Sequence, residues 1–375
     1  MYLKCIEIEG FRNLEKAAVE FEKQYNFIFG ENAQGKTNLI EAVYLLCLAK
    51  SFRTLDDKEL VAFHRDNFLI IGNFTDQYYD LKKVSVSYSQ SSGKKIKIDG
   101  KNIDQFSKLV GQFPIIILSS NDLMITSGPP LYRRRFFNVL LCQSYSRYLD
   151  DLKKFEKVLK QRNAILSKNA KGQHFSEQEL DIWSQQLIDI GAAIILFRAQ
   201  IVDEINKYIA DLYKKISSDS ENLSIRYQPN VAFSHVSEIK KNFEQSLNRV
   251  GTRERKMGLS LAGPHRDDYL FSIGTRDIRS YGSRGEHKSV LVSLKAAETI
   301  LLRQKAQTDP ILLLDDLYAE LDQDRGKGVL ELFNMNGQIF ITGPSQENER
   351  VRGLIKGKVD SAIFWVRAGS VERAT

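Results

Sequence analysis

Eight consecutive residues, GENAQGKT at 30–37, have the types and spacing of a phosphate-binding loop. The two glycines let the backbone turn so that several N–H groups point at one anion. Lys36 supplies a positive charge for the β and γ phosphates, and the Thr37 hydroxyl can coordinate Mg²⁺. The stretch therefore predicts a site for a nucleoside triphosphate, and its expected contacts are Gly30, Glu31, Asn32, Ala33, Gln34, Gly35, Lys36 and Thr37.

Two adjacent carboxylates end the apolar stretch PILLL, with Asp315 first and Asp316 second. A buried strand that stops in this way is typical of a Walker B motif, in which the first carboxylate holds Mg²⁺. The second carboxylate orients or deprotonates the attacking water. A core strand with polar ends would have the same composition, so the prediction depends on the phosphate-binding loop beside it.

A third candidate is the turn Ser283-Arg284-Gly285-Glu286, which leads directly into a helical run that ends near residue 304. Serine and glycine at a helix N-terminus form an anion site, because free N–H groups and the helix dipole both favour negative charge. The alternative is an ordinary surface turn with a helix cap.

The surrounding pattern predicts the elements that position these residues. A buried strand over 25–30 precedes the loop, and a helix over 36–51 follows it, so the phosphates would face a helix N-terminus. Long helical periods begin near 129 and again at 180–216, and the paired helices would form an arm on the order of 50 Å long. Lys36 and Asp315 lie 279 residues apart, so the nucleotide-binding domain must be split by an insertion. We therefore expect a head at 1–125 and 223–375, with a helical lobe inserted at 126–222.

Composition sets broader limits. A chain of 375 residues with 42% hydrophobic and 27% charged residues predicts a globular protein of two lobes. No apolar run approaches a membrane span, and the N-terminus has a strand pattern and not that of a signal peptide. Three widely spaced cysteines fit reduced thiols of a cytoplasmic protein. The net charge of +7 permits a polyanionic partner without establishing one.

The order of these motifs resembles an ABC-type ATPase head, in which an S-x-G-x signature caps the γ-phosphate held by a second subunit. The tripeptide ELD at 320–322 resembles the D-loop that follows Walker B. Further stretches are similar to the RecF family: IEGFRNLEK before the loop, KSFRT at 50–54, GPPLYRRRFFN at 128–138 and LAGPHRDD at 261–268. The resemblance spans the whole chain in the same order.

This resemblance implies an α/β fold, an ABC-type head with a mixed sheet that is split by an inserted helical arm. It implies ATP and Mg²⁺ as cofactors, an ATP-dependent homodimer, and binding of single- and double-stranded DNA at gaps or junctions. It also implies cooperation with RecO and RecR in loading RecA, induction of the SOS response, and weak ATPase activity that serves as a switch. Open alternatives are a DNA-binding module with negligible turnover and an ATPase subunit of another DNA-maintenance complex.

The resemblance also assigns roles to residues. Catalytic roles are expected for Asp316, Lys36 and Ser283, and metal binding for Thr37 and Asp315. Further nucleotide contacts are expected from Arg12, Asn13, Ser283, Gly285 and Glu286. Asp316 stands where transporters carry glutamate, and its shorter side chain predicts slow turnover. Thr342 stands in place of their switch histidine, so its role is left open. For His265 to Asp268 a structural salt-bridge network is favoured over a metal site.

Overall fold

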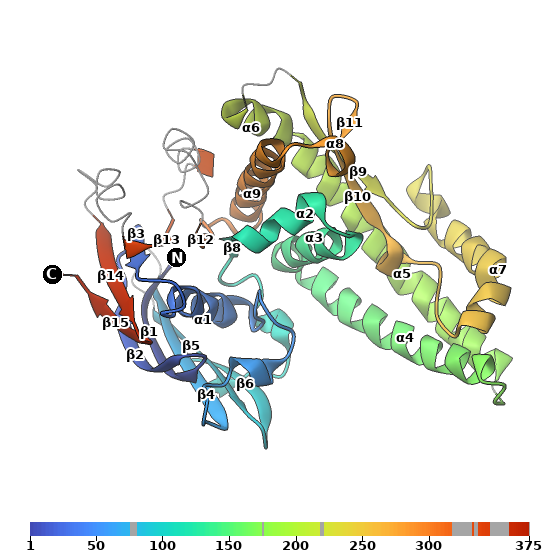
Figure 1. Ribbon diagram of the computed structural model, residues 1–375. Coiled ribbons are helices and arrows are strands. Elements are labelled where there is room, and N and C mark those ends of the chain that lie inside the picture. Colours follow the sequence, from blue (N-terminus) through green and yellow to red (C-terminus); the bar gives the residue numbers. More distant parts are fainter. Residues whose placement is uncertain are drawn as a thin grey trace. The chain divides into compact units, whose positions relative to one another are not determined.

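The computed structural model describes residues 1–75, 81–174, 176–217, 221–316, 332–333, 337–345 and 360–374. The chain folds into two compact units (Figure 1). The first unit combines Met1–Leu123 with Val292–Thr375, and the second is the continuous segment Met124–Leu291. The first unit is therefore split in sequence, as the wide separation of Lys36 and Asp315 requires.

One sheet of the first unit is antiparallel, with the strand order β2-β1-β4-β5-β6-β7. Its strands alternate between buried and exposed residues, as expected for a sheet with one face on the core. For example, Val84, Val86 and Tyr88 of β5 are buried while the residues between them are not. The strands are β1 (Tyr2–Phe11), β2 (Leu14–Glu20), β4 (Asn67–Thr75), β5 (Leu81–Ser89), β6 (Gly93–Ile98) and β7 (Lys101–Asn102).

The other sheet of the first unit is mostly parallel, with the order β15-β14-β3-β13-β12-β8. Its central strands are short apolar runs, which is typical of strands covered on both faces. The strands are β3 (Tyr25–Phe29), β8 (Ile115–Leu118), β12 (Ile311–Leu314), β13 (Ile339–Gly343), β14 (Ser361–Arg367) and β15 (Ser370–Arg373). Because β3, β13 and β12 are parallel neighbours, their carboxyl ends meet at one edge.

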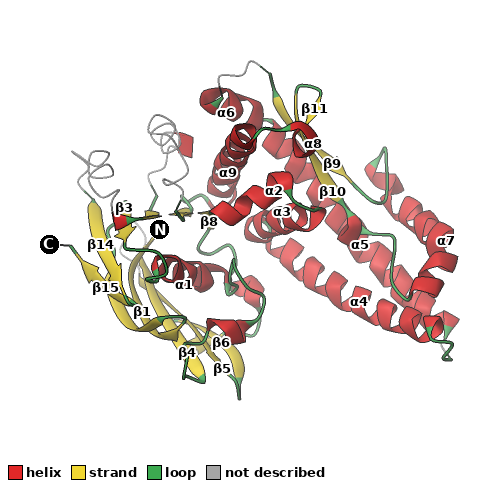
Figure 2. Ribbon diagram, in the orientation of Figure 1, coloured by secondary structure: helices red, strands yellow, loops and turns green. Residues whose placement is uncertain are grey.

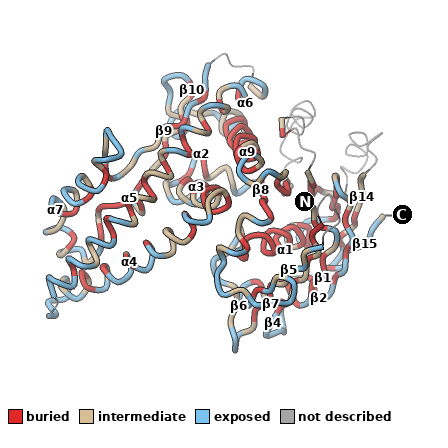
Figure 3. The backbone as a smooth tube through the Cα atoms, turned by 180° about the vertical axis from the view of Figure 1, so that it is seen from behind, coloured by how far each residue is buried: buried red, intermediate tan, exposed pale blue. Residues whose placement is uncertain are grey.

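Helix α1 (Lys36–Leu48) packs against strands of both sheets, β1, β4 and β5 on one side and β8 and β13 on the other. Eleven of its 13 residues are buried, and Figure 3 shows it almost wholly in the buried colour. A helix that is apolar around most of its circumference is stable only inside a core. The sequence LIEAVYLLCLA thus positions the N-terminus of α1 directly after the phosphate-binding loop.

The second unit is mainly helical, with a small antiparallel sheet of order β11-β10-β9 (Figure 2). Its long helices α4 and α5 pack along each other, and α7 packs against both. The elements are α2 (Leu123–Ser127), α3 (Pro130–Ser144), α4 (Ser146–Ala170), α5 (Glu177–Asn206), α6 (Ile209–Ile216), β9 (Leu223–Gln228), α7 (Ile239–Met257), β10 (Asp268–Ile273), β11 (Arg276–Asp277), α8 (Ile278–Tyr281) and the start of α9 (Arg284–Ala306), whose residues from Val292 on belong to the first unit. In the described part of the chain, no helix combines the length and the apolar character needed to span a membrane.

The α/β fold with an inserted helical arm agrees with the sequence prediction, and α5 alone is ~45 Å long at 1.5 Å per residue. The boundary of the insertion differs. The prediction ended the lobe at 222, whereas the second unit continues to Leu291. The reason is that β9 packs on α5 and α6, and α7 packs on α4 and α5, so 223–291 completes the core of the arm.

Candidate nucleotide-binding site

The phosphate-binding loop joins β3 to α1, as predicted. Two glycines in it are required by the local geometry. A Cβ on Gly30 would lie 2.4 Å from the carbonyl oxygen of Val366, so no side chain fits there. Gly35, the N-cap of α1, has φ of +120°, and a Cβ there would lie 2.7 Å from the Asn13 side chain. The loop can therefore approach a phosphate closely at the N-terminus of a 13-residue helix.

Lys36 is 4% exposed, and its ammonium group folds back over the loop. Its Nζ donates to the carbonyl oxygens of Gly30, at 2.8 Å, and of Glu31, at 3.2 Å. The buried Lys36 ammonium would bind an anionic phosphate more strongly than it binds the two neutral carbonyls. Hydrogen bonds between charged partners are stronger than those to a neutral acceptor. The charge thus stands within the loop where an anion would bind.

Three predicted side chains converge at the carboxyl ends of β12 and β13. The Oδ1 atom of Asp315 accepts hydrogen bonds from the hydroxyls of Thr37, at 3.0 Å, and Thr342, at 2.8 Å. The Thr342 hydroxyl also accepts from the backbone N–H of Asp316 at 2.9 Å. Thr342 therefore contacts Asp315 through its carboxylate and Asp316 through its backbone. The predicted D-loop, 320–322, lies outside the described residues.

The electrostatics of this edge fit a cation. Burial raises the pKa of Asp315, and Asp316 beside it acts in the same direction, which together disfavour two bare charges. The Oδ1 atom of Asp316 is buried without a hydrogen-bond partner among the described residues, and Asp316 has φ of +50°. Oxygen ligands from a hydroxyl and a carboxylate are those that Mg²⁺ prefers. Thr37 and Asp315 lie together at this edge, and metal binding by them stays a prediction.

Asn13 stabilises the phosphate-binding loop through side-chain hydrogen bonds. Its Nδ2 donates to the carbonyl oxygen of Gln34 at 2.9 Å, and its Oδ1 accepts from Asn38 at 2.7 Å. The turn between β14 and β15 holds Gln34 as well, through the N–H groups of Ala368 and Gly369. These hydrogen bonds support the loop, while a direct nucleotide contact of Asn13 stays a prediction.

Glu41 is a site residue that the sequence reasoning missed. It is fully buried on α1, where its carboxylate binds Arg12 at 3.1 Å and Arg53 at 3.2 Å and accepts from the Ser51 hydroxyl at 2.5 Å. The positive charge of Arg53 also acts on Asp315, where it opposes the burial that raises the pKa of that carboxyl. An acidic residue on the apolar helix LIEAVYLL was the available signal. Glu41 holds both arginines beside the loop, and a nucleotide contact of Arg12 stays a prediction.

The predicted signature lies in the second unit, at the start of α9. Ser283 and Glu286 form a reciprocal cap: the N–H of Ser283 donates to Glu286 at 2.7 Å, and the N–H of Glu286 donates to the Ser283 hydroxyl at 3.2 Å. Arg276 pairs with Glu286 at 3.2 Å. These interactions lower the pKa of Glu286, with the Ser283 N–H as the largest cause. Ser283 is exposed, and Gly285 lies between the capping residues.

The segment His265 to Asp268 is the structural network that the sequence favoured. Arg198 is 2% exposed and donates to Asp267 at 2.6 Å, to Asn138 at 3.0 Å and to the Tyr148 hydroxyl at 3.2 Å. The Tyr227 hydroxyl also donates to Asp267. Burial raises the pKa of Tyr148 to about 12, so this phenol stays protonated. The network ties α3, α4, α5 and β9 together.

Asp268 and His265 of this segment also make structural contacts. Asp268 binds the buried Arg133 at 2.7 Å and 3.1 Å, and the His265 ring lies 3.2 Å from the Ser260 carbonyl oxygen. Burial lowers the pKa of His265 to about 4, so the ring is neutral at pH 7. No cluster of metal-ligating side chains occurs among the residues that the structure describes.

The comparisons with known proteins agree with this arrangement. The family model of the RecF/RecN/SMC N-terminal domain matches residues 2–351. The DNA replication and repair protein RecF of Halalkalibacterium halodurans is 36% identical over 100% of both chains. That of Bacillus subtilis is 34% identical, over 95% of this chain and 98% of the relative.

Solved structures show the same relationship. The recombination mediator protein RecF with ATP, in the RecFOR pathway, superposes with a TM-score of 0.90 at 30% identity, over 100% of this chain and 98% of that one. An Smc head bound to the C-terminal winged-helix domain of ScpA superposes with a TM-score of 0.54 at 14% identity, which shows the fold alone. The predicted ABC-type head with a helical arm is thus confirmed. The chain belongs to the RecF family of DNA replication and repair proteins, within the RecF/RecN/SMC group of ATPase heads.

Proposed function

We propose that this chain is an ATP-gated DNA-binding protein of recombinational repair and replication-fork recovery. The observation that carries the proposal is the convergence of the phosphate-binding loop, Asp315 and Thr342 at one edge of the parallel sheet. ATP binding is further supported by the related RecF whose structure contains ATP. Lys36 holds the β and γ phosphates, and Thr37 and Asp315 hold Mg²⁺, which neutralises phosphate charge when bound.

ATP also joins two copies of the chain. Ser283, with the N-terminus of α9, completes the phosphate site of the second copy, and Gly285 leaves room for close approach. Two features support this role: Ser283 is exposed, and its hydroxyl is held by the cap with Glu286. The hydroxyl accepts from the Glu286 N–H, so its own hydrogen stays available for a phosphate oxygen. Binding of ATP thus favours the dimer, and hydrolysis releases it.

The first test compares Ser283→Arg with Ser280→Arg, an equal change at an exposed position three residues earlier. In the Ser283 variant we expect ATP to bind with unchanged affinity, because the phosphate-binding loop is intact, while the ATP-dependent dimer is lost. The control should dimerise like the wild type. Light scattering with and without ATP and Mg²⁺ gives the mass, and a Ser283 variant that still doubles its mass would refute the shared site.

The second test concerns turnover. Asp316 is one methylene shorter than the glutamate that transporters carry at this position, and its backbone N–H donates to the Thr342 hydroxyl. We expect hydrolysis well below one per second, a rate suited to a timer. Phosphate release at saturating ATP measures it. A rate in the tens per second would contradict the proposal, whereas an undetectable rate would favour the alternative of a DNA-binding module without useful turnover.

The wider role follows from the family. One relative is described as the recombination mediator in the RecFOR pathway. We accordingly place this chain with RecO and RecR at gaps and single-/double-strand junctions, where it helps RecA displace single-strand-binding protein and leads to the SOS response. Mass measurements of the ATP-bound protein on gapped, single-stranded and blunt duplex DNA test the preferred structure. Equal binding to all three would refute a preference for gaps.

A further inference from the structure

The sequence contains four basic clusters, and in three of them one side chain pairs with a carboxylate. Arg133 of the run at 133–135 is 1% exposed and bonded to a carboxylate. Lys94 donates to Asp57 at 2.6 Å, and Arg255 pairs with Glu177 at 2.9 Å. The fourth cluster, Lys153-Lys154, lies on α4, and further lysines follow along that helix.

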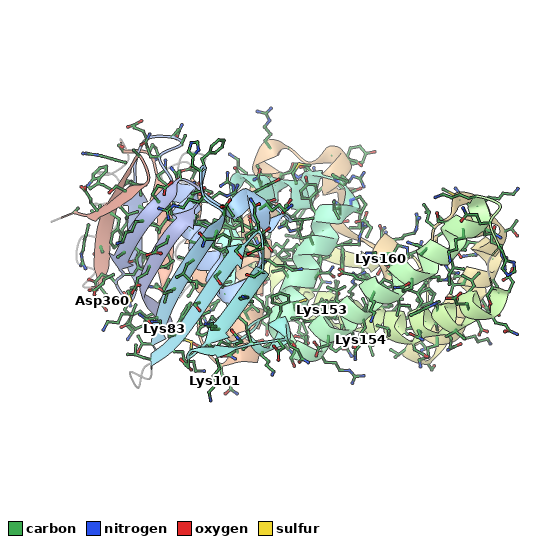
Figure 4. All side chains as sticks on the ribbon, turned by 90° about the horizontal axis from the view of Figure 1, so that it is seen from below. Lys83, Lys101, Lys153, Lys154, Lys160 and Asp360 are labelled. Carbon is green, nitrogen blue, oxygen red and sulfur yellow. The ribbon has the colours of Figure 1, made fainter. Side chains whose placement is uncertain are left out.

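The lysine face of α4 consists of Lys153, Lys157, Lys160 and Lys168. Their spacings of four, three and eight residues place them on one side of an α-helix. Figure 4 labels Lys153 and Lys160 together with the neighbouring Lys154. The face is ~22 Å long, at 1.5 Å per residue. Lys157, Lys160 and Lys168 are exposed, and their ammonium groups make no ion pair or hydrogen bond among the described residues.

Packing of the opposite side of α4 keeps the lysine face toward solvent. Phe155, Val158, Ile165 and Leu166 are buried, and α4 packs against α5 and α7. The helix therefore cannot turn its lysines inward without exposing that apolar side. Glu156 is the one acidic residue between Lys153 and Lys168, and it lies four residues before Lys160, at a neighbouring position of the helix surface. Lys157, Lys160 and Lys168 of the lysine face present positive charge outward and form no ion pair among the described residues.

The side-chain types on the lysine face favour one class of binding partner. Lysines are point charges that contact phosphate without reading bases, so a regular polyanion of any sequence fits. Single-stranded nucleic acid is gripped by aromatic stacking, and no aromatic side chain of α4 is exposed. A lipid surface needs apolar side chains beside the charges, and no large apolar side chain of α4 is exposed either. Along ~22 Å, one strand of a duplex offers about six phosphates.

We propose that the lysine face of α4 is a docking surface for the phosphate backbone of duplex DNA. The proposal rests on the DNA binding proposed above and adds which surface and which form of DNA it involves. The contact is independent of base sequence, and it depends strongly on salt because each neutralised phosphate releases counterions.

The test neutralises three lysines in Lys157→Gln/Lys160→Gln/Lys168→Gln. The matched control, Lys214→Gln/Lys215→Gln/Lys241→Gln, changes three exposed lysines on α6 and α7 of the same unit, so both variants lower the net charge of +7 equally. Fluorescence anisotropy with a 30-base-pair duplex, with ATP and at several salt concentrations, gives the affinity and its salt slope. We expect the α4 variant to bind at least ~10-fold more weakly and its slope to fall by about 2 to 3, and the control to match the wild type.

The outcomes separate the two proposals. If the wild-type protein binds no DNA with ATP, the proposed function itself is wrong. If the wild type binds and the α4 variant keeps the affinity and slope of the control, the lysine face is not the docking surface. Equal losses on a single strand or on duplex RNA would overturn the assignment to duplex DNA, whereas a loss confined to duplex DNA supports it.

Discussion

Replacing Lys36 by methionine is expected to weaken ATP binding at least ~100-fold while the fold is retained. Methionine keeps most of the buried aliphatic volume and removes only the ammonium group, which now bonds the Gly30 and Glu31 carbonyl oxygens. A charged hydrogen bond contributes about 1.5–3 kcal/mol, and 1.4 kcal/mol corresponds to tenfold in affinity. Loss of two such contacts to phosphate accounts for the expected change. Isothermal titration with ATP and Mg²⁺ measures it.

The matched control for this prediction is Lys50→Met, which removes an exposed lysine just after α1. It lowers the net charge by the same amount, so a general electrostatic effect would weaken both variants alike. Thermal unfolding without nucleotide tests whether the loop variant is folded. An affinity within tenfold of the wild type, in a folded Lys36 variant, would show that Lys36 does not hold the phosphates.

Replacing Arg198 by methionine should destabilise the second unit by about 3–5 kcal/mol, because it leaves the buried carboxylate of Asp267 without its cation. Tyr227 and the Asn230 N–H still donate to that carboxylate, yet neither carries a charge. Urea unfolding measures the loss. Trp183 of α5 packs against buried Ile165, Leu166 and Leu180, so its fluorescence reports this unit once the chain's other tryptophan has been replaced by phenylalanine.

Two further variants serve as controls for the Arg198→Met experiment. Arg147→Met removes an arginine of α4 that is 80% exposed and pairs with Asp151 at 3.6 Å, so it should cost less than about 1 kcal/mol. The double variant Arg198→Met/Asp267→Asn should recover part of the loss, because no unpaired charge remains buried. A cost below about 1 kcal/mol for Arg198→Met alone would mean that the network contributes little to stability.

The parts that could be predicted from the sequence are those encoded by neighbouring residues. The loop 30–37 specifies its own geometry, because its glycines and the helix that follows act through the backbone within a few residues. The apolar run before Asp315 likewise encodes a buried strand with a polar end. The wide spacing of these motifs required an inserted lobe, which the structure contains.

Only the tertiary structure decided which distant side chains meet. Arg133 and Lys157 are both basic residues in helical patterns, yet the first is buried against Asp268 and the second is exposed. Glu41 binds Arg12 and Arg53 only because α1 is enclosed by two sheets. The boundary at 222 was misplaced for the same reason, since α7 belongs to the arm through its packing. Periodicity tells which side of a helix is apolar, but the burial and pairing of a charge depend on the partner that the fold brings to it.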